Sequence, residues 1–390
     1  MASIKDRIRY SLPYRMYRAT FNNLVRLFPV KKNKIVFDNF GGKGFGDDPK
    51  YIALQILKDY PDEFELYWFV KDINAALPKE ITPVKYGTIR AAYHMATAKV
   101  WVDNIKSSFK IKKKKNQFYI QTWHSTLGLK KNEAQVENLP EKYVKESKRD
   151  AAMTDLMYSN NDFRYDIYKN HFWYEGKVMK CSVPRNAVIM ETPKGLKDSI
   201  YERYGIDKKL QLLLYAPTFR KEENANAITF DYTRVLDNLR EKFGKDCVCL
   251  VRLHPNDVSR YKSLTFTDKV INASDYPDMQ ELLAVSDYLI TDYSAVMFDF
   301  SFAMKPVFLL MKDYQTYLKK ERELHFTMEE LPFDKAVNED ELEEIISSFS
   351  IEDYKKNCTA FFERIGLKEN GDGAKVIAGI IYESCKKLSR

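Results

Sequence analysis

Short apolar runs alternate with stretches of helical periodicity along the chain. Apolar runs bounded by turn residues are typical of buried strands, and apolar residues with the period of an α-helix indicate amphipathic helices. In the first half of the sequence this pattern predicts strands at 34–38, 64–70, 99–102, 118–121, 156–159 and 177–181. Helices are expected between these strands, including 49–59 and 142–153.

The second half repeats the alternation after an interruption near residues 190–209. Strands are predicted at 211–215, 247–253, 270–272, 288–291 and 307–310. The helices predicted among them include 232–243, 279–285 and 295–304. The last of these helices is almost wholly apolar but contains one carboxylate, Asp299.

This order of elements predicts an α/β fold with two Rossmann-like, doubly wound domains facing a cleft. A chain of 390 residues is too long for one ordinary core, and two domains of roughly 150–200 residues are expected. We place them at 35–200 and 201–390, after a separate segment at 1–34. Ligands of such folds bind at the carboxyl ends of the parallel strands.

Positive charge is concentrated in the first segment. Residues 1–34 hold nine Lys or Arg residues and one acid, Asp6, which equals the whole formal net charge of +8. Apolar and aromatic residues alternate with these cations, so we predict a segment that binds an anionic membrane surface. The alternative is a helix packed on the protein's own core with solvated charges. No nucleic-acid motif accompanies the basic residues, and no nucleic-acid partner is expected.

Other features limit the class of protein. No stretch approaches the roughly 20 apolar residues needed to span a bilayer, and no signal peptide is visible. The five cysteines have no metal-ligand spacing, which favours reduced thiols in a cytosolic protein. No acidic metal cluster is evident, so we expect no bound metal and no cofactor.

Polar segments follow four predicted strands directly. They are Thr122–Thr126, which contains His124; Ala216–Arg220; His254–Asp257; and Asp292–Ser294. The carboxyl ends of parallel strands meet at one edge of a sheet, so these groups are expected to converge. Cationic side chains and free N–H groups are what a phosphate or pyrophosphate requires.

Each of these residues also has a structural alternative. Ser294 is a natural helix N-cap, and Thr218 with Arg220 can form a turn and a surface ion pair. Histidines at strand ends, such as His124 and His254, often bond to backbone. For Asp299, pairing with a nearby cation is the favoured interpretation. The occurrence of compatible groups at four strand ends is what favours a functional site.

A glycine cluster, Gly41 to Gly46, follows the first predicted strand. Its spacing matches neither dinucleotide-binding nor P-loop motifs. We interpret it as a flexible loop on the rim of the cleft, leading into a helix that starts near Asp47, Asp48 and Pro49.

Taken together, these segments resemble the CDP-glycerol glycerophosphotransferase family of teichoic-acid primases and polymerases. The resemblance extends over roughly residues 35–380. The matching pieces are Gly46–Lys50, Trp123–Thr126, Val183–Asn186, Tyr215–Arg220, Arg252–Pro255, Asp292–Ser294 with Phe298-Asp299, and Asp372-Gly373. Three positions depart from the family pattern: Ser125 stands where glycine is usual, Ala295 replaces the second serine of a pair, and Ala187 ends the Pro-Arg-Asn motif.

The resemblance implies a GT-B-like pair of domains, with a CDP-alditol held mainly by the second. It implies catalytic histidines at His124 and His254, and donor contacts from Thr218, Arg220, Ser294 and Asp299. We expect further substrate contacts from Trp123, Ser125, Asp292 and Asp372. The departures at Ser125 and Ala187 lie on the acceptor side.

The expected reaction moves glycerol phosphate or ribitol phosphate from a CDP-alditol to a hydroxyl of a prenyl-linked saccharide or polyol-phosphate polymer, with CMP released. The resemblance implies a bacterial cell-wall enzyme at the cytoplasmic face of the membrane, attached peripherally. Two alternatives stay open: a nucleotide-sugar glycosyltransferase on the same fold, and a non-catalytic membrane-bound scaffold.

Overall fold

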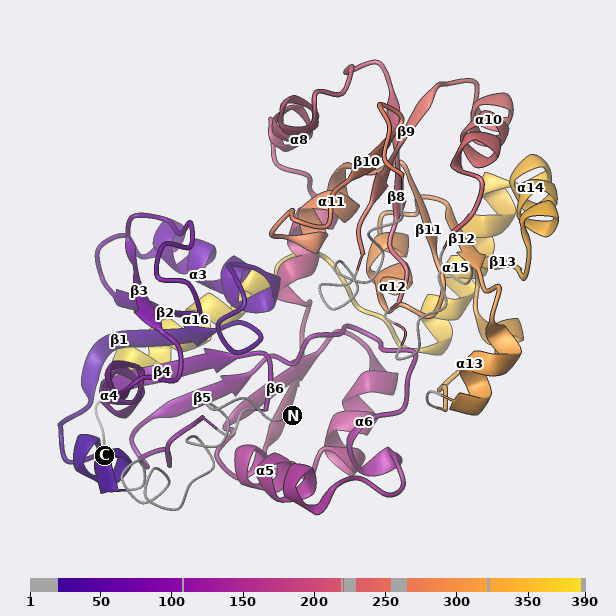
Figure 1. Cartoon of the computed structure of the whole chain (residues 1–390). Helices are drawn as coiled ribbons and strands as arrows, with labels where there is room; N and C mark the ends of the chain where they lie inside the picture. The colour runs from indigo at the N-terminus through magenta and orange to yellow at the C-terminus, as the bar shows by residue number, and fades with distance from the viewer. Residues whose placement is uncertain are drawn as a thin grey trace, which may run out of the picture.

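The computed structural model describes residues 20–106, 109–218, 220, 229–253, 265–320 and 323–386. Figure 1 shows two lobes, each built around one sheet with helices packed against it. In the first lobe the strand order is β3-β2-β1-β4-β5-β6-β7, and in the second it is β10-β9-β8-β11-β12-β13. All strand pairings within the two sheets are parallel. The expectation of two doubly wound α/β units is confirmed.

The first-lobe strands are β1 (Lys31–Asp38), β2 (Glu65–Val70), β3 (Ile81–Lys85), β4 (Ala98–Asp103), β5 (Phe118–Gln121), β6 (Leu156–Ser159) and β7 (Lys177–Lys180). Helices and 3₁₀ turns around this sheet are α3 (Asp47–Asp59), α4 (Ile89–Thr97), η1 (Glu133–Gln135), α5 (Glu141–Ala151), α6 (Asp162–His171) and η2 (Pro184–Asn186). Helix α7 (Ala187–Met190) follows η2 and buries Val188 and Ile189 in the core of the second lobe.

The second-lobe strands are β8 (Gln211–Tyr215), β9 (Cys247–Val251), β10 (Val270–Asn272), β11 (Tyr288–Thr291), β12 (Val307–Leu310) and β13 (Asp334–Ala336). The remaining helices are α8 (Leu196–Tyr204), α10 (Tyr232–Phe243), α11 (Met279–Val285), α12 (Val296–Ser301), α13 (Tyr314–Lys320), η3 (Met328–Glu330), α14 (Glu339–Ser348), α15 (Ile351–Arg364) and α16 (Gly373–Lys386).

The sequence pattern missed two strands, β3 and β13, and both lie at a sheet edge. Strand β3 contains Pro83 and exposes Thr82 and Lys85, and β13 is only three residues long. Edge strands need little apolar content because one side of their backbone is unpaired. Their sequences therefore lack the apolar run that identifies a central strand.

Helix α12 is shorter than the predicted 295–304. It spans Val296–Ser301, and its N-cap residue is Ala295, with no side-chain capping bond. The prediction that Ser294 caps this helix is therefore wrong. At the other end Met304 has φ of +53°, a left-handed conformation that an α-helix cannot contain, and Pro306 follows.

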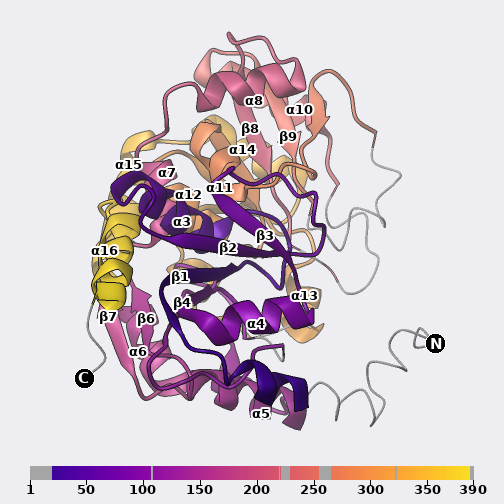
Figure 2. The ribbon, with the colours of Figure 1, turned by 90° about the vertical axis from the view of Figure 1, so that its left-hand side faces the viewer.

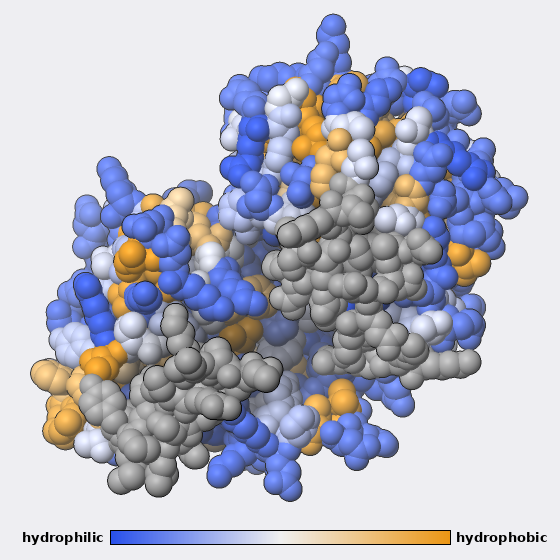
Figure 3. All heavy atoms as spheres, in the orientation of Figure 1, coloured by the Kyte–Doolittle hydropathy of each residue, from blue (hydrophilic) through white to orange (hydrophobic). Residues whose placement is uncertain are grey.

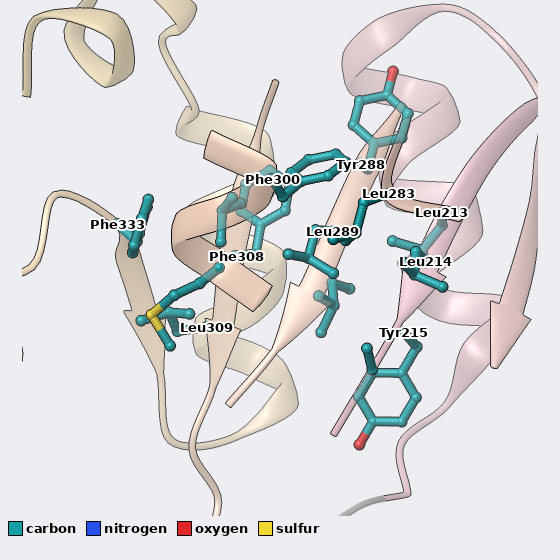
Figure 4. Packing of buried hydrophobic residues seen from close by; sticks show 14 of the residues in the cluster. Leu213, Leu214, Tyr215, Leu283, Tyr288, Leu289, Phe300, Phe308, Leu309 and Phe333 are labelled. Carbon is teal, nitrogen blue, oxygen red and sulfur yellow. The ribbon is translucent and has the colours of Figure 1, made fainter. Parts of the chain in front are cut away.

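The centre of the second lobe is a layer of fully buried apolar side chains on β8, β11 and β12. Leu213, Leu289 and Phe308 have no exposed surface. Figure 4 shows Phe300 of α12 lying against this layer. These strands are buried on both faces, which explains why they read as continuous apolar runs in the sequence.

Helix α16 follows the second lobe in sequence but packs on the first. Its residues Ile377, Ala378 and Ile381 are fully buried in the cluster that contains the β1 side chains. Figure 2 shows the helix along the flank of the first sheet. A Cβ on Gly373 would lie 2.2 Å from the carbonyl oxygen of Ser182, so the start of α16 requires glycine. The chain thus passes between the lobes twice.

We predict that Ile381→Ala destabilises the first lobe by about 2–4 kcal/mol, because the buried side chain leaves a cavity between α16 and the sheet. Chemical denaturation monitored by Trp68 and Trp101 fluorescence, both in this lobe, measures the loss. Ile380→Ala is the matched control, since Ile380 is only partly buried on the same helix. Equal effects of the two substitutions would contradict the packing described here.

Candidate active site

His124 follows β5 directly and is held by the backbone of the neighbouring strand. Its Nδ1 lies 2.8 Å from the carbonyl oxygen of Asn104, the residue after β4. A carbonyl oxygen only accepts hydrogen bonds, so Nδ1 carries the proton and donates it. In the neutral ring, Nε2 then has a free lone pair. The backbone therefore presents His124 as a base through Nε2.

Aromatic rings fix the plane of this imidazole. The Trp123 ring stacks on it with centroids 4.3 Å apart, and the Phe40 ring lies 5.3 Å away. Trp123 has φ of +57°, a conformation uncommon outside glycine, which turns the chain sharply where β5 ends. The predicted substrate contact Trp123 is itself buried beneath His124.

Burial lowers the pKa of His124 below its usual value of 6.5. The Asn104 carbonyl and Asp47 act in the opposite direction, and the charges of Arg185 and Arg164 lower the pKa further. His124 is consequently neutral at neutral pH. A neutral imidazole with Nε2 unprotonated is the form that can accept a proton.

Asn104 was not singled out from the sequence, yet it organises this edge of the sheet. Its side chain is fully buried and donates to the side-chain oxygens of Asn39 and Asp47, both at 2.7 Å. Its own Oδ1 accepts from the backbone N–H of Phe40 at 2.8 Å. One residue thus ties His124 to the start of α3 and to the glycine-containing loop.

The loop Phe40–Gly46 is fixed by hydrogen bonds at several points. The N–H of Gly42 donates to Asp38 Oδ1 at 2.8 Å, and the side chain of Asn39 donates to the carbonyls of Lys43 and Gly44. Gly42 has φ of +81°, and a Cβ there would lie 3.0 Å from the backbone of residues 70 and 71. The loop that was predicted to be flexible at the rim of the cleft therefore has a conformation fixed by hydrogen bonds, beside His124.

A buried ion-pair cluster joins this site to the second lobe. Arg185 of η2 donates to Asp47 at 2.8 Å, to Thr126 Oγ1 at 3.0 Å and to Asp299 of α12 at 3.2 Å. Gln280 also donates to Asp299, at 3.1 Å. The favoured interpretation of Asp299, pairing with a cation, is confirmed. Its Oδ1 is buried and has no hydrogen-bond partner among the described residues.

The loop after His124 enters the second lobe. Leu127 and Leu129 are buried in that lobe's core, and the carbonyl of Leu129 accepts from the backbone N–H of His325 at 2.8 Å. Lys50 of α3 adds a second connection through salt bridges to Asp278 and Glu281 at 2.6 and 2.5 Å. Contacts from both lobes therefore restrain the elements around His124.

Arg220 stands in a second cluster, at the carboxyl ends of β8 and β11. It is buried and paired with two carboxylates, Asp292 at 2.8 Å and Asp313 at 2.7 Å. Asp292 also accepts from the backbone N–H of Thr218 at 2.8 Å. The Thr218 hydroxyl oxygen is buried and has no partner among the described residues. The structural alternative for Arg220 was a surface ion pair; the structure contains an ion pair, but a buried one.

The other predicted site residues are placed as follows. Ser125 is half-buried beside His124 and accepts from Arg164 at 3.1 Å. Ser294 is half-buried just before α12. Asp372 is exposed at the start of α16, where it interacts with Asn370 rather than with the His124 cluster. His254 lies outside the described residues.

The sequence did not point to Asp313, Arg185 or Arg164 as individual contributors. Arg185 stands in a quoted motif, but its burial depends on partners more than one hundred positions away. Asn104 could have been found from the sequence in one way. The polar pair Asp103-Asn104 directly follows the predicted strand 99–102, which neighbours the strand before His124. Within the described part of the chain, no cluster of three His, Cys, Asp or Glu residues has the geometry of a metal site.

Residues 20–383 match the family model described as CDP-Glycerol:Poly(glycerophosphate) glycerophosphotransferase. The chain belongs to this family. It is 30% identical over 376 residues to the teichoic acid poly(glycerol phosphate) polymerase of Staphylococcus epidermidis, covering 92% of this chain. It is 27% identical to the teichoic acid glycerol-phosphate transferase of Staphylococcus aureus, over 97% of this chain and 100% of that protein.

A solved structure of a glycerophosphotransferase relative has the same fold throughout. The wall teichoic acid polymerase TagF superposes with a TM-score of 0.82 at 29% identity, covering 95% of this chain and 93% of that one. The chain spans about half, 52%, of the full length of the Staphylococcus epidermidis and Bacillus subtilis polymerases. It therefore corresponds to one large part of those longer glycerophosphotransferase-family proteins.

We predict that Asn104→Ala releases the His124 ring from its single tautomer, because the carbonyl that accepts from Nδ1 loses its side-chain anchors. Imidazole ¹⁵N NMR at neutral pH should show Nδ1–H in the parent and a mixture of Nδ1–H and Nε2–H in the variant. His124→Gln assigns the signal among the five histidines. Asn116→Ala, an exposed asparagine just before β5, is the control. An unchanged His124 spectrum in Asn104→Ala would contradict this role.

Proposed function

We propose that the chain transfers an alditol-phosphate unit from CDP-glycerol or CDP-ribitol to a hydroxyl of a lipid-linked saccharide or alditol-phosphate polymer. The observation that carries the proposal is the neutral His124, whose Nδ1–H donates to Asn104 and whose Nε2 is free to accept a proton. Family membership identifies the class of donor. Its relatives include both glycerol-phosphate and ribitol-phosphate enzymes, so both alditols are proposed.

In this mechanism the acceptor hydroxyl lies against His124 Nε2. Its oxygen attacks the alditol-bearing phosphorus while the proton passes to Nε2. The new P–O bond forms as the bond to the bridging oxygen breaks, and CMP leaves with that electron pair. A positioned general base of this kind contributes roughly 10²–10⁴-fold to the rate. The Asn104 carbonyl stabilises the imidazolium that results.

The donor is proposed to lie on the second lobe, at the carboxyl ends of β8 and β11. Thr218 supports this placement, because its buried hydroxyl oxygen has no partner among the described residues and can bond to a bound ligand. Arg220 is already paired with Asp292 and Asp313, so it acts by holding the Thr218 segment in place. Ser294 and His254 are kept as proposed direct contacts of the pyrophosphate, and Asp299 Oδ1 as an acceptor for an alditol hydroxyl.

Membrane attachment is proposed for the first helical segment, residues 20–28. Val25 is buried against the first lobe and Phe28 packs on Tyr93, which fixes the segment to the body. Leu24, Leu27 and Phe28 remain 53%, 80% and 51% exposed. Figure 3 shows hydrophobic surface at the lower left, over this segment. Lys31, Lys32 and other cations lie close by, the composition that binds anionic lipid surfaces.

Among the helices formed by described residues, none is both long and apolar enough to cross a bilayer. We propose a peripheral attachment, at the cytoplasmic leaflet where the lipid-linked acceptor would be reached.

We predict that the parent chain releases CMP from CDP-glycerol or CDP-ribitol in the presence of a prenyl-linked saccharide, and that His124→Gln lowers this rate about 10²–10⁴-fold. Donor affinity, measured by calorimetry, should stay within about twofold. Because only neutral His124 accepts a proton and its pKa is lowered, kcat/KM should fall on acidification only below about pH 6.5. Turnover of UDP-sugars without turnover of either CDP-alditol would refute the proposal.

We predict that Leu24→Ser, Leu27→Ser and Phe28→Ser together lower binding to anionic vesicles by about tenfold or more, since each exposed side chain buries apolar area at the interface. Vesicle sedimentation at low and high salt measures the effect, and high salt should weaken the parent. The control carries serine at Ile73, Val337 and Ile351, which are 47%, 49% and 40% exposed elsewhere. If both triple variants bind vesicles as the parent does, the attachment site is elsewhere.

A further inference from the structure

Arg164 is a buried cation that pairs with no carboxylate among the described residues. Its side chain, on the first turn of α6, has no exposed surface. Nη2 donates to Ser125 Oγ at 3.1 Å, whereas Nε and Nη1 have no hydrogen-bond partner among the described residues. Within that part of the chain no Asp or Glu forms a salt bridge with it. A guanidinium in this state has given up its hydration without recovering the energy elsewhere.

Arg164 and Arg185 are both buried, but their charges are balanced differently. Arg185 is equally buried in the same lobe, but Asp47 and Asp299 neutralise it and Thr126 accepts from it. Arg164 instead lies over the rings of Tyr168 and Phe172, with centroids 4.9 and 5.4 Å away. Such cation–π contacts return only part of the cost of burying a charge. Within the described part of the chain, the positive charge of Arg164 behind the His124 loop therefore stays uncompensated.

Among the described residues of the second lobe, no carboxylate forms a salt bridge with Arg164. The group that faces this region from that lobe is His325, whose Nε2 is buried and has no partner among the described residues. Burial, together with the charge of Arg164, lowers the pKa of His325 to about 4, so it is neutral. His325 packs against Phe163 and not against a carboxylate.

Ser125 lies between the Arg164 guanidinium and the partly exposed surface beside His124. It is half-buried and immediately follows His124. Because its Oγ accepts from Arg164, its own O–H proton is free to point elsewhere and to donate to a ligand oxygen. Gly128 allows the loop to close around the pair, since a Cβ there would lie 3.3 Å from Ser125 Oγ and 3.5 Å from Arg164 Nη1.

We propose that Ser125, with Arg164 behind it, binds an anionic phosphate oxygen of the acceptor next to the attacking hydroxyl, and so makes the chain select acceptors that already carry phosphate. This inference rests on the proposed function, in which His124 receives the acceptor's proton. Ser125 is the substrate contact, and Arg164 is a positioning residue that strengthens it. The assignment to the acceptor follows from location, since the proposed donor contacts Thr218 and Ser294 stand on the other lobe.

The test compares two acceptors: a soluble lipid-linked disaccharide that ends in one glycerol phosphate, and the same disaccharide without it. The ratio of their kcat/KM values is measured for the full parent chain, Ser125→Ala and Arg164→Met. A charge-assisted hydrogen bond corresponds to about tenfold or more, so the parent should prefer the phosphate-bearing acceptor by that factor. Both variants should bring the ratio close to one. CDP-glycerol affinity, measured by calorimetry, should not change.

Ser147→Ala is the matched control, because Ser147 is a buried serine of the same lobe whose hydroxyl oxygen has no partner among the described residues. It should keep the parent's ratio. Arg164→Met tests whether the effect is on acceptor choice or on stability. The substitution removes a buried charge, so Tm should stay the same or rise, while the preference for the phosphate-bearing acceptor should be lost. If Arg164→Met fails to fold, Ser125→Ala decides the question alone.

An unchanged ratio of kcat/KM values in Ser125→Ala would overturn the proposal. It would also be overturned if Ser125→Ala lost CDP-glycerol affinity to the same extent as acceptor preference, because the bound phosphate would then belong to the donor. If the parent turns over neither acceptor, the proposed function fails separately. A short glycerol-phosphate oligomer should then still raise the parent's Tm and leave that of Ser125→Ala unchanged. Equal rises in both proteins would refute the site.

Discussion

The architecture around His124 depends on one buried arginine. Arg185 contacts the start of α3, the loop after β5 and helix α12 at the same time, through Asp47, Thr126 and Asp299. Asp47 and Asp299 neutralise the charge of Arg185 and Thr126 accepts a hydrogen bond from it, so moving any of these elements would weaken buried charged interactions, which is unfavourable. The three elements are therefore held in one arrangement. Because α12 belongs to the second lobe, the same contacts also fix that lobe against the proposed base.

The two lobes use charge differently. At the second-lobe strand ends, Arg220 is surrounded by Asp292 and Asp313, so its cluster is a rigid support for the Thr218 segment. In the first lobe, Arg164 donates to Ser125 and has no carboxylate partner among the described residues. An arginine paired with carboxylates holds neighbouring segments in fixed positions. An arginine without a carboxylate partner produces a positive electrostatic potential that can attract an anionic ligand.

The central strands and the polar segments at their ends could be predicted from sequence because both are local. The continuous apolar run Leu212–Tyr215 predicts a buried strand from its own composition. His124 follows a second such run, the strand β5, within three residues. The edge strands, the early end of α12 and the partners of Arg185 and Arg220 could not be predicted. They depend on residues distant in the chain, and no periodicity encodes such pairings. His124 could be proposed as a base, but its protonation state required the Asn104 carbonyl, a backbone atom that every residue has.

The docking of α16 on the first lobe has a consequence for how the protein is made. The first sheet is complete once β7 has been synthesised, but the apolar surface that α16 covers stays open until residues 373–386 emerge. At typical rates of translation, that delay is roughly ten to forty seconds. During this time the nascent first lobe exposes Ile35 and Phe37 to water beneath the missing helix, which makes it a natural client for a chaperone. Completion of the first half of the molecule is thereby tied to synthesis of the second.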